Sequence, residues 1–265
     1  MPPEVSPSPA VLIASYSLLC SLLNAVSISI FPAVFPIIST LEASLQYQMF
    51  TKVTSTAHAI GMFAMTAYYF LYINTKWEID FVSDSNHTHE SLCTYAMIGY
   101  LIYDTLIELK PYFSPKSKGN KIEFEFIIHH ILGLISHVTT LYYRKPCAFY
   151  FTMAVFVAEL STPFLNITWT LHHLKMKDSK LYSIFILLLP LTFFLSRIVL
   201  SPIILYQIVT TRHLWGPEQI DYYLWFGNCI VIVLFVLLNY YWFAKLLAIA
   251  LGGKEKEKKK EKKDQ

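Results

Sequence analysis

The segment Phe124–His137, with the sequence FEFIIHHILGLISH, places two adjacent histidines inside an apolar run that otherwise is typical of a membrane span. An ionisable side chain in hydrocarbon is costly, so it usually faces a protein interior and marks a functional site. His130 and His137 are seven residues apart, two helical turns, so they share one helix face with Gly133 between them. His129 points about 100° away from His130. We therefore expect one histidine of the pair to face the inside of a helix bundle, and the function to lie near it.

The composition indicates an all-α, polytopic membrane protein. Of the 265 residues, 55% are hydrophobic and 15% are charged, and the mean hydropathy is +0.45. A soluble domain carries about 25% charged residues. The charges are also unevenly spread, because none lies between Glu4 and Glu42 or between Lys180 and Arg197.

Seven apolar stretches approach the length of about 20 residues that crosses a bilayer. The predicted spans are residues 10–31, 56–73, 92–109, 122–142, 147–170, 181–208 and 222–251. We expect Pro32 and Pro36 to end the first span. Pro190 and Pro202 should kink the sixth.

Loop charge and a glycosylation motif predict the orientation. The loops at residues 110–121 and 175–180 and the C-terminal tail are rich in lysine and fall on one side of a seven-span chain. Basic loops stay cytosolic. The opposite side carries the sequon Asn86-His87-Thr88, which makes Asn86 a candidate for glycosylation in the lumen. We expect a lumenal N-terminus and a cytosolic C-terminus, although Arg144 and Lys145 are basic on the lumenal side.

The C-terminal tail suggests the endoplasmic reticulum, and the cysteines give no pattern of a metal site. Lys262 and Lys263 match the dilysine signal that coat proteins read on endoplasmic reticulum membrane proteins, so retrieval machinery is an expected partner. The alternative is that the lysines bind anionic lipid headgroups. No nucleic-acid partner is expected. The four cysteines follow no metal-binding spacing, so no metal is expected, and a disulfide between Cys93 and Cys147 stays open.

Polar side chains inside the predicted spans need partners. In a structural interpretation Arg197 pairs with Glu159 or Asp104, and Glu108 reaches the interface from its helix end. In a functional one, a histidine near a carboxylate acts as a general base on an amine or hydroxyl that attacks an acyl donor. The candidate catalytic residues are His129, His130 and Glu159. The candidate lipid-binding residues are Asp104, Asn166, Arg197 and His58.

At these residues the sequence resembles the TLC-domain family, which includes ceramide synthases and translocon-associated membrane proteins. The most specific segments are Phe126–His130 (FIIHH) and Ala158–Asn166 (AELSTPFLN), and the resemblance also includes Ser55–His58 and Gly99–Asp104. The chain looks most similar to the branch that is not ceramide synthase. The resemblance implies that six or seven helices enclose a long cavity suited to an acyl chain.

The resemblance also divides the chain and limits its chemistry. It covers about residues 52–247. Together with the predicted spans and charges, it predicts a lumenal N-terminus and first span in residues 1–45, a TLC domain in residues 46–251 and a basic tail in residues 252–265. The ceramide synthase pattern has a His-Asp pair after the double histidine, but the region Val155–Glu159 reads VFVAE, and Gly133 replaces an expected threonine.

The resemblance therefore implies a lipid-handling protein of the endoplasmic reticulum membrane, involved in lipid homeostasis. It would bind membrane lipids in its bundle or transfer an acyl group, with no cofactor and with acyl-CoA as the co-substrate. The alternative is a trafficking adaptor or cargo receptor without catalytic activity, in which the histidines are structural. A transporter with a buried proton relay is the third hypothesis, against which the lack of an internal repeat weighs.

Overall fold

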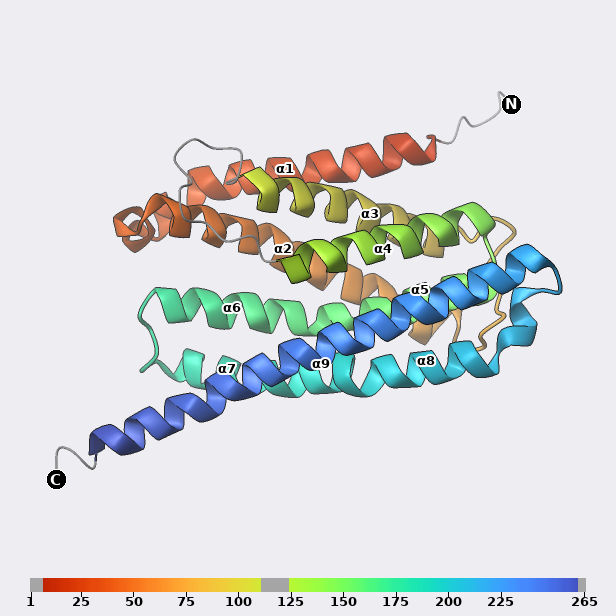
Figure 1. The fold of residues 1–265 in the computed structure, drawn as a ribbon. Coiled ribbons are helices and arrows are strands. Elements are labelled where there is room, and N and C mark those ends of the chain that lie inside the picture. The colour runs from red at the N-terminus through yellow and green to blue at the C-terminus, as the bar shows by residue number, and fades with distance from the viewer. Residues whose placement is uncertain (1–6, 111–123, 262–265) are drawn as a thin grey trace.

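The computed structural model describes residues 7–110 and 124–261, with side chains described as far as residue 248. These residues form helices joined by turns, with no strand among them (Figure 1). The helices are α1 Pro9–Val34, α2 Ala43–Tyr68, α3 Thr88–Leu109, α4 Phe124–Tyr143, α5 Pro146–Phe156, α6 Thr162–His173, α7 Lys180–Phe193, α8 Leu200–Thr210 and α9 Gln219–Glu261. Shorter 3₁₀ and π turns are η1 Pro36–Thr40, η2 Tyr69–Ile73, η4 Val157–Ser161, η5 Phe194–Val199 and η6 Arg212–Trp215.

The helices of the described residues join into seven rods, since η4 links α5 to α6 and η5 links α7 to α8. Six of the rods are long and apolar enough to cross a membrane: Pro9–Val34, Thr88–Leu109, Phe124–Tyr143, Pro146–His173, Lys180–Thr210 and Gln219–Ala248. The predicted helical membrane bundle is therefore confirmed, and the protein is a multi-pass membrane protein. A crossing by α2, the seventh rod, stays a prediction.

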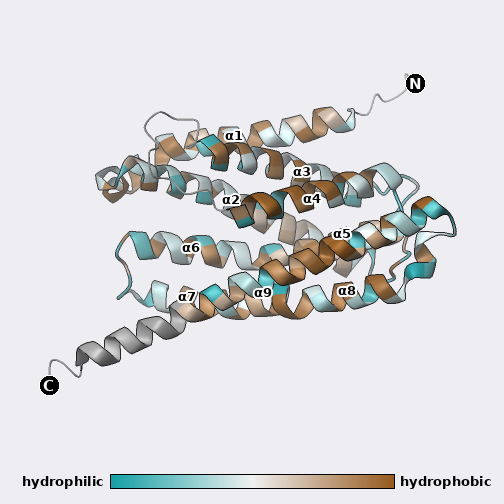
Figure 2. Cartoon of the chain, in the orientation of Figure 1, coloured by the Kyte–Doolittle hydropathy of each residue, from teal (hydrophilic) through white to brown (hydrophobic). Residues whose placement is uncertain are grey.

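Contacts between the rods define a ring. Helix α2 contacts α3, α3 contacts α4, α4 contacts α9, α9 contacts α7, α7 contacts α6, and α6 returns to α2. Helix α1 is not part of this ring, because it packs on α3 and α2 from outside. Figure 2 shows that apolar residues predominate along α4, α8 and the described part of α9.

Helix α2 begins much earlier than the sequence predicts. The second span is predicted to start at residue 56, but α2 starts at Ala43, so Gln46, Gln48 and Lys52 lie within a helix. The predicted start is too late because polar side chains of this part of the helix, Gln48 and Lys52, line a space between the helices. Lys52, for example, lies over the ring of Trp169, 5.2 Å from its centroid. Polar residues that face other helices give the same composition as a loop.

Proline residues lie inside two of the rods, with different effects. Pro190 lies inside α7, and a π turn, η5, begins four residues later. Proline lacks the N–H that a continuous helix needs, and such interruptions are where kinks and π turns arise. In α1, by contrast, Pro32 lies inside the helix, which ends at Val34, so the expected stop at Pro32 is late by one turn.

The connections group the charges by end. The turn at residues 174–179 lies at the same end of the bundle as the start of α2 and the end of α9 (Figure 1); we call this the basic end. The loop at residues 74–87, the turn at Arg144 and Lys145, and the start of α1 lie at the other end, the sequon end. Which end faces the cytosol stays a prediction.

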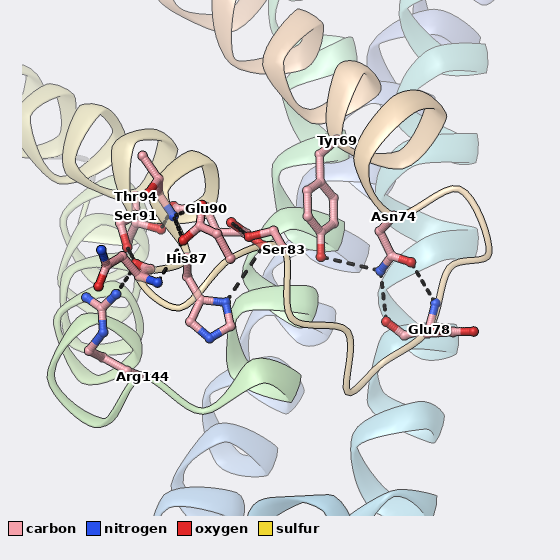
Figure 3. Close-up of polar contacts among 12 residues, drawn as sticks. Tyr69, Asn74, Glu78, Ser83, His87, Glu90, Ser91, Thr94 and Arg144 are labelled. Atoms are coloured by element: carbon pink, nitrogen blue, oxygen red, sulfur yellow. Dashed lines mark hydrogen bonds and ion pairs between the residues drawn. The ribbon is translucent and has the colours of Figure 1, made fainter.

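At the sequon end, side chains fix the loop before α3 (Figure 3). The amide of Asn74 donates to the Glu78 carbonyl at 2.8 Å, and Ser83 donates to the buried carboxylate of Glu90 at 2.7 Å. Asn86 itself is exposed, and Arg144 donates to its backbone carbonyl. The sequon therefore lies on an ordered, accessible loop.

The contact between α1 and α3 is close at Gly99. A Cβ atom there would lie only 2.7 Å from the carbonyl oxygen of Ile13. Small residues let membrane helices approach to this extent. Cys20 of α1 is buried in the same contact and, like the other three cysteines, is free. The disulfide considered between Cys93 and Cys147 is therefore not formed.

Candidate functional site

The ring of helices encloses a cavity of about 1200 Å³. Small-molecule pockets typically measure about 300–1,000 Å³, so this one suits a large ligand. Its lining extends along α4 from Glu125 to His137, which corresponds to about 18 Å of helix. That is more than half of the ~30 Å hydrocarbon core of a bilayer.

The two parts of the cavity differ in character. The lining at the basic end includes Lys110 and Lys245, and Lys245 forms an ion pair of 2.7 Å with Glu125. The deep part, toward the middle of the bundle, is mostly apolar. Its lining includes Met97, Leu101, Phe156, Ile204, Ile232 and Phe235. Between these two parts the lining carries Asp104, His130, Glu159 and Arg197, which we call the polar ring.

His130 is one of the residues of the polar ring. Its neighbours determine which nitrogen of its imidazole carries a proton. The Thr105 hydroxyl lies 2.6 Å from the carbonyl oxygen of Leu101 and 3.0 Å from Nδ1 of His130. A carbonyl oxygen can only accept, so the hydroxyl donates its single proton there and accepts from Nδ1–H. We infer on this basis that Nδ1 is protonated, which leaves Nε2 for chemistry.

The free nitrogen of His130 faces an acid. Nε2 lies 3.4 Å from Oδ2 of Asp104, and both side chains line the cavity. With Nδ1 protonated, one further proton between Nε2 and the carboxylate would join the two groups, and its release would leave both atoms able to accept a proton. Such a pair can take up or release a proton next to a bound substrate.

The other histidines of α4 line the same cavity. His129 packs against Phe235 and Trp242 of α9, with ring centroids 5.1 and 5.4 Å apart, and its enclosed Nδ1 has no hydrogen-bond partner among the described residues. His137 is buried beside Phe156. The buried face of α4 is His130, Gly133, His137 and Thr140, which is the face predicted from the seven-residue spacing.

Arg197 reaches the cavity from η5 and does not form the expected ion pair. Its Nε donates to Ser161 at 2.8 Å, its Nη2 donates to Thr162 at 3.4 Å, and the guanidinium lies over the ring of Phe193. Among the described residues, no carboxylate oxygen, from Glu159 or Asp104, lies within 4.0 Å of it. The predicted pairing with either acid is therefore wrong, although Glu159 lines the same cavity.

Two further candidates have packing roles in the structure. The amide of Asn166 lines the cavity, but it donates to Ser55 and Thr56 at 3.1 Å and so ties α6 to α2. His58 does not line the cavity. It stacks on Tyr100 with centroids 3.8 Å apart, and its Nδ1 lies 3.1 Å from the Tyr16 hydroxyl of α1.

The structure thus brings six of the seven predicted site residues to one cavity and leaves His58 outside it. Glu108 is exposed and also lines the cavity, at its basic end. Lys262 and Lys263 lie outside the described residues. Sequence reasoning missed Thr105, which orients His130, because an isolated threonine beside Asp104 gives no pattern. No group of three or more His, Cys, Asp or Glu in the described residues could hold a metal ion.

Comparison with known proteins points to a single family. A family model described as the TLC domain matches residues 47–248, which cover the six rods of the ring except the start of α2 and the end of α9, and leave out all of the residues before α2. TLC domain-containing protein 4 A of Dictyostelium discoideum is 25% identical over 166 residues, which cover 62% of this chain and 60% of that protein. The match therefore spans less than two thirds of that relative.

Proposed function

Because the chain belongs to the TLC domain family, we propose that it binds the acyl chain of a lipid in its cavity and contributes to lipid homeostasis in the endoplasmic reticulum membrane. The observation that carries this proposal is the cavity of about 1200 Å³, apolar at its deep end and crossed by a ring of ionisable side chains. An acyl chain would fill the deep part. The polar end of the lipid would then lie beside His130 and Asp104.

The reaction for which this site is suited is acyl transfer. In the form in which neither His130 Nε2 nor the Asp104 carboxylate carries a proton, Nε2 would take the proton of an amine or hydroxyl as that nucleophile forms its bond to the acyl carbonyl carbon. The carbon–sulfur bond of acyl-CoA would break, and the proton would pass to the leaving thiolate. Thr105 and Asp104 orient the imidazole, and His129 and Glu159 lie on the walls where the acceptor would bind.

Charge and burial indicate how each substrate would enter. Lys110 and Lys245, at the basic end, would attract the phosphates of acyl-CoA, which comes from water. Each methylene that leaves water contributes about 0.8 kcal/mol. A lipid from the bilayer only exchanges one apolar environment for another, so its chain contributes little net energy. Selection among membrane lipids would then depend on the polar ring and on the shape of the cavity.

The test is the lipid composition of cells that lack the protein, rescued at matched expression. We expect wild type to restore a defined lipid class and His129→Ala/His130→Ala to fail. The matched control is His172→Ala/His173→Ala, a second adjacent pair that does not line the cavity and should rescue like wild type. If the His129/His130 variant rescues fully, the histidines are structural and the adaptor hypothesis replaces this proposal.

A further inference from the structure

The guanidinium of Arg197 is a buried cation with incomplete local partners. The residue is only 9% exposed, and its contacts are the hydroxyls of Ser161 and Thr162 and the face of Phe193. Arginine has five N–H groups. The hydrogen bonds to Ser161 and Thr162 use two of these N–H groups, so the other three donate to no residue in the described part of the chain.

The local structure explains why Glu159 does not complete this set. Ser161 and Thr162 follow Glu159 by two and three residues, and the 3₁₀ turn η4 presents their hydroxyls to Arg197 in place of the carboxylate. A buried charge within a membrane is tolerated when it has an opposite charge or a full set of hydrogen bonds. Glu159 attracts the guanidinium electrostatically without contacting it. Arg197, lining an open cavity, is therefore placed to receive a contacting negative charge and further hydrogen bonds from a ligand.

We propose that Arg197 binds the oxyanion of a single-chain amphiphile, a carboxylate or a phosphate group. This inference rests on the proposed binding of an acyl chain and adds the charge of the head group. A guanidinium fork matches both oxyanions through paired N–H donors. Lys110 and Lys245 add positive potential at the basic end of the cavity, where an anionic ligand would enter.

The positions along the helices fit such a ligand. Ile204, which lines the deep part, follows Arg197 by seven residues, or about 10 Å along the same rod. An oxyanion on Arg197 therefore leaves its chain free to lie among Phe156, Ile204 and Ile232. On the opposite wall, His130 and Asp104 would lie beside the head group.

Three amphiphiles of one chain length test the inference: palmitate, hexadecyl phosphate and hexadecanol. Binding to the full chain in phosphatidylcholine nanodiscs is compared at equal mole fraction in the bilayer, by displacement of radiolabelled palmitate. We expect at least one of the two anions to bind about ten- to a hundredfold more tightly than the alcohol, the range expected for a buried charged hydrogen bond. The two anions distinguish a fatty acid from a phosphate head group.

Variants then assign the effect to Arg197. Arg197→Gln should reduce the anions to the affinity of the alcohol. Arg212→Gln, the matched control at an arginine that does not line the cavity, should bind them as well as wild type. Equal binding of all three amphiphiles by wild type would overturn the role of Arg197 and leave lipid binding intact. Binding of none would overturn the proposed function itself. Because the wild-type comparison needs no variant, it decides the question even if Arg197→Gln fails to fold.

Discussion

The replacement of Gly99 by alanine tests how tightly α1 is held on the outside of the ring. A Cβ atom at Gly99 would lie 2.7 Å from the carbonyl oxygen of Ile13 and 3.2 Å from the backbone nitrogen of Ser17. Both are backbone atoms of α1, so no side-chain rotation relieves the contact. The helix must move by about 0.7 Å to reach 3.4 Å, where ordinary contact begins.

This displacement sets the expected size of the effect. Over-packing a tight contact destabilises a protein by about 1–3 kcal/mol. We therefore expect Gly99→Ala to lower the free energy of unfolding by that amount. The control is Gly61→Ala, because nothing lies within 4 Å of a Cβ atom at Gly61, which is exposed on α2. Its stability should stay unchanged or rise by up to about 1 kcal/mol, the helix-propensity gain of alanine over glycine.

Two measurements on the full chain in detergent micelles check the result. The first is denaturant unfolding of wild type and both variants. The second is the rate of maleimide labelling at Cys20, which is 4% exposed in the contact between α1 and α3, quantified by peptide mass spectrometry. We expect faster labelling in Gly99→Ala only. If Gly99→Ala unfolds like wild type and Cys20 is labelled at the wild-type rate, the close contact of α1 with α3 does not hold this helix.

Three further predictions concern the rest of the bundle. Asn166→Leu removes the amide that joins α6 to α2, and unfolding measurements should show a loss of about 1 kcal/mol, typical of an interhelical hydrogen bond in a membrane; an unchanged midpoint would contradict this. Asn86→Gln should abolish an endoglycosidase-sensitive gel shift of the wild-type chain, and a shift that persists in the variant would contradict a lumenal loop. The backbone N–H of Asn86 donates to Asp84 and lowers the pKa of that carboxyl. The ionised carboxylate of Asp84 therefore stabilises the loop at any pH above its unfolded pKa. This contribution is lost as the pH falls through the lower pKa of the folded state. Hydrogen exchange should accordingly show the amide of Asn86 losing protection below about pH 4 in wild type, and Asp84→Asn should lack this acid-dependent step.

Sequence periodicity predicted the elements in which one helix face is distinct. The spacing of His130 and His137 requires a shared face at any position of α4, and the structure buries both. The length and hydropathy of the apolar stretches likewise fixed the helical class of the fold. These predictions depend only on the geometry of a single helix.

Contacts between helices could not be predicted in the same way. The partners of Arg197 were expected to be acids, because opposite charges attract at any sequence distance, but the 3₁₀ turn η4 turns Ser161 and Thr162 toward it. Thr105 orients His130 from another helix, which no local pattern records. The first residues of α2 were left out of the second predicted span because hydropathy does not distinguish a polar residue inside a helix bundle from one in a loop.

The order of synthesis gives the ring of helices a consequence for biogenesis. Helix α9 supplies one wall of the cavity through Ile232, Phe235, Asn239 and Trp242, and it is made after the other five rods of the ring. Until α9 docks, the side of the cavity that contains His129 and Arg197 faces lipid or the insertion machinery. Charged groups at that depth are unfavourable in lipid. In the interval before its last helix arrives, a nascent chain of this fold therefore has to keep these side chains away from lipid.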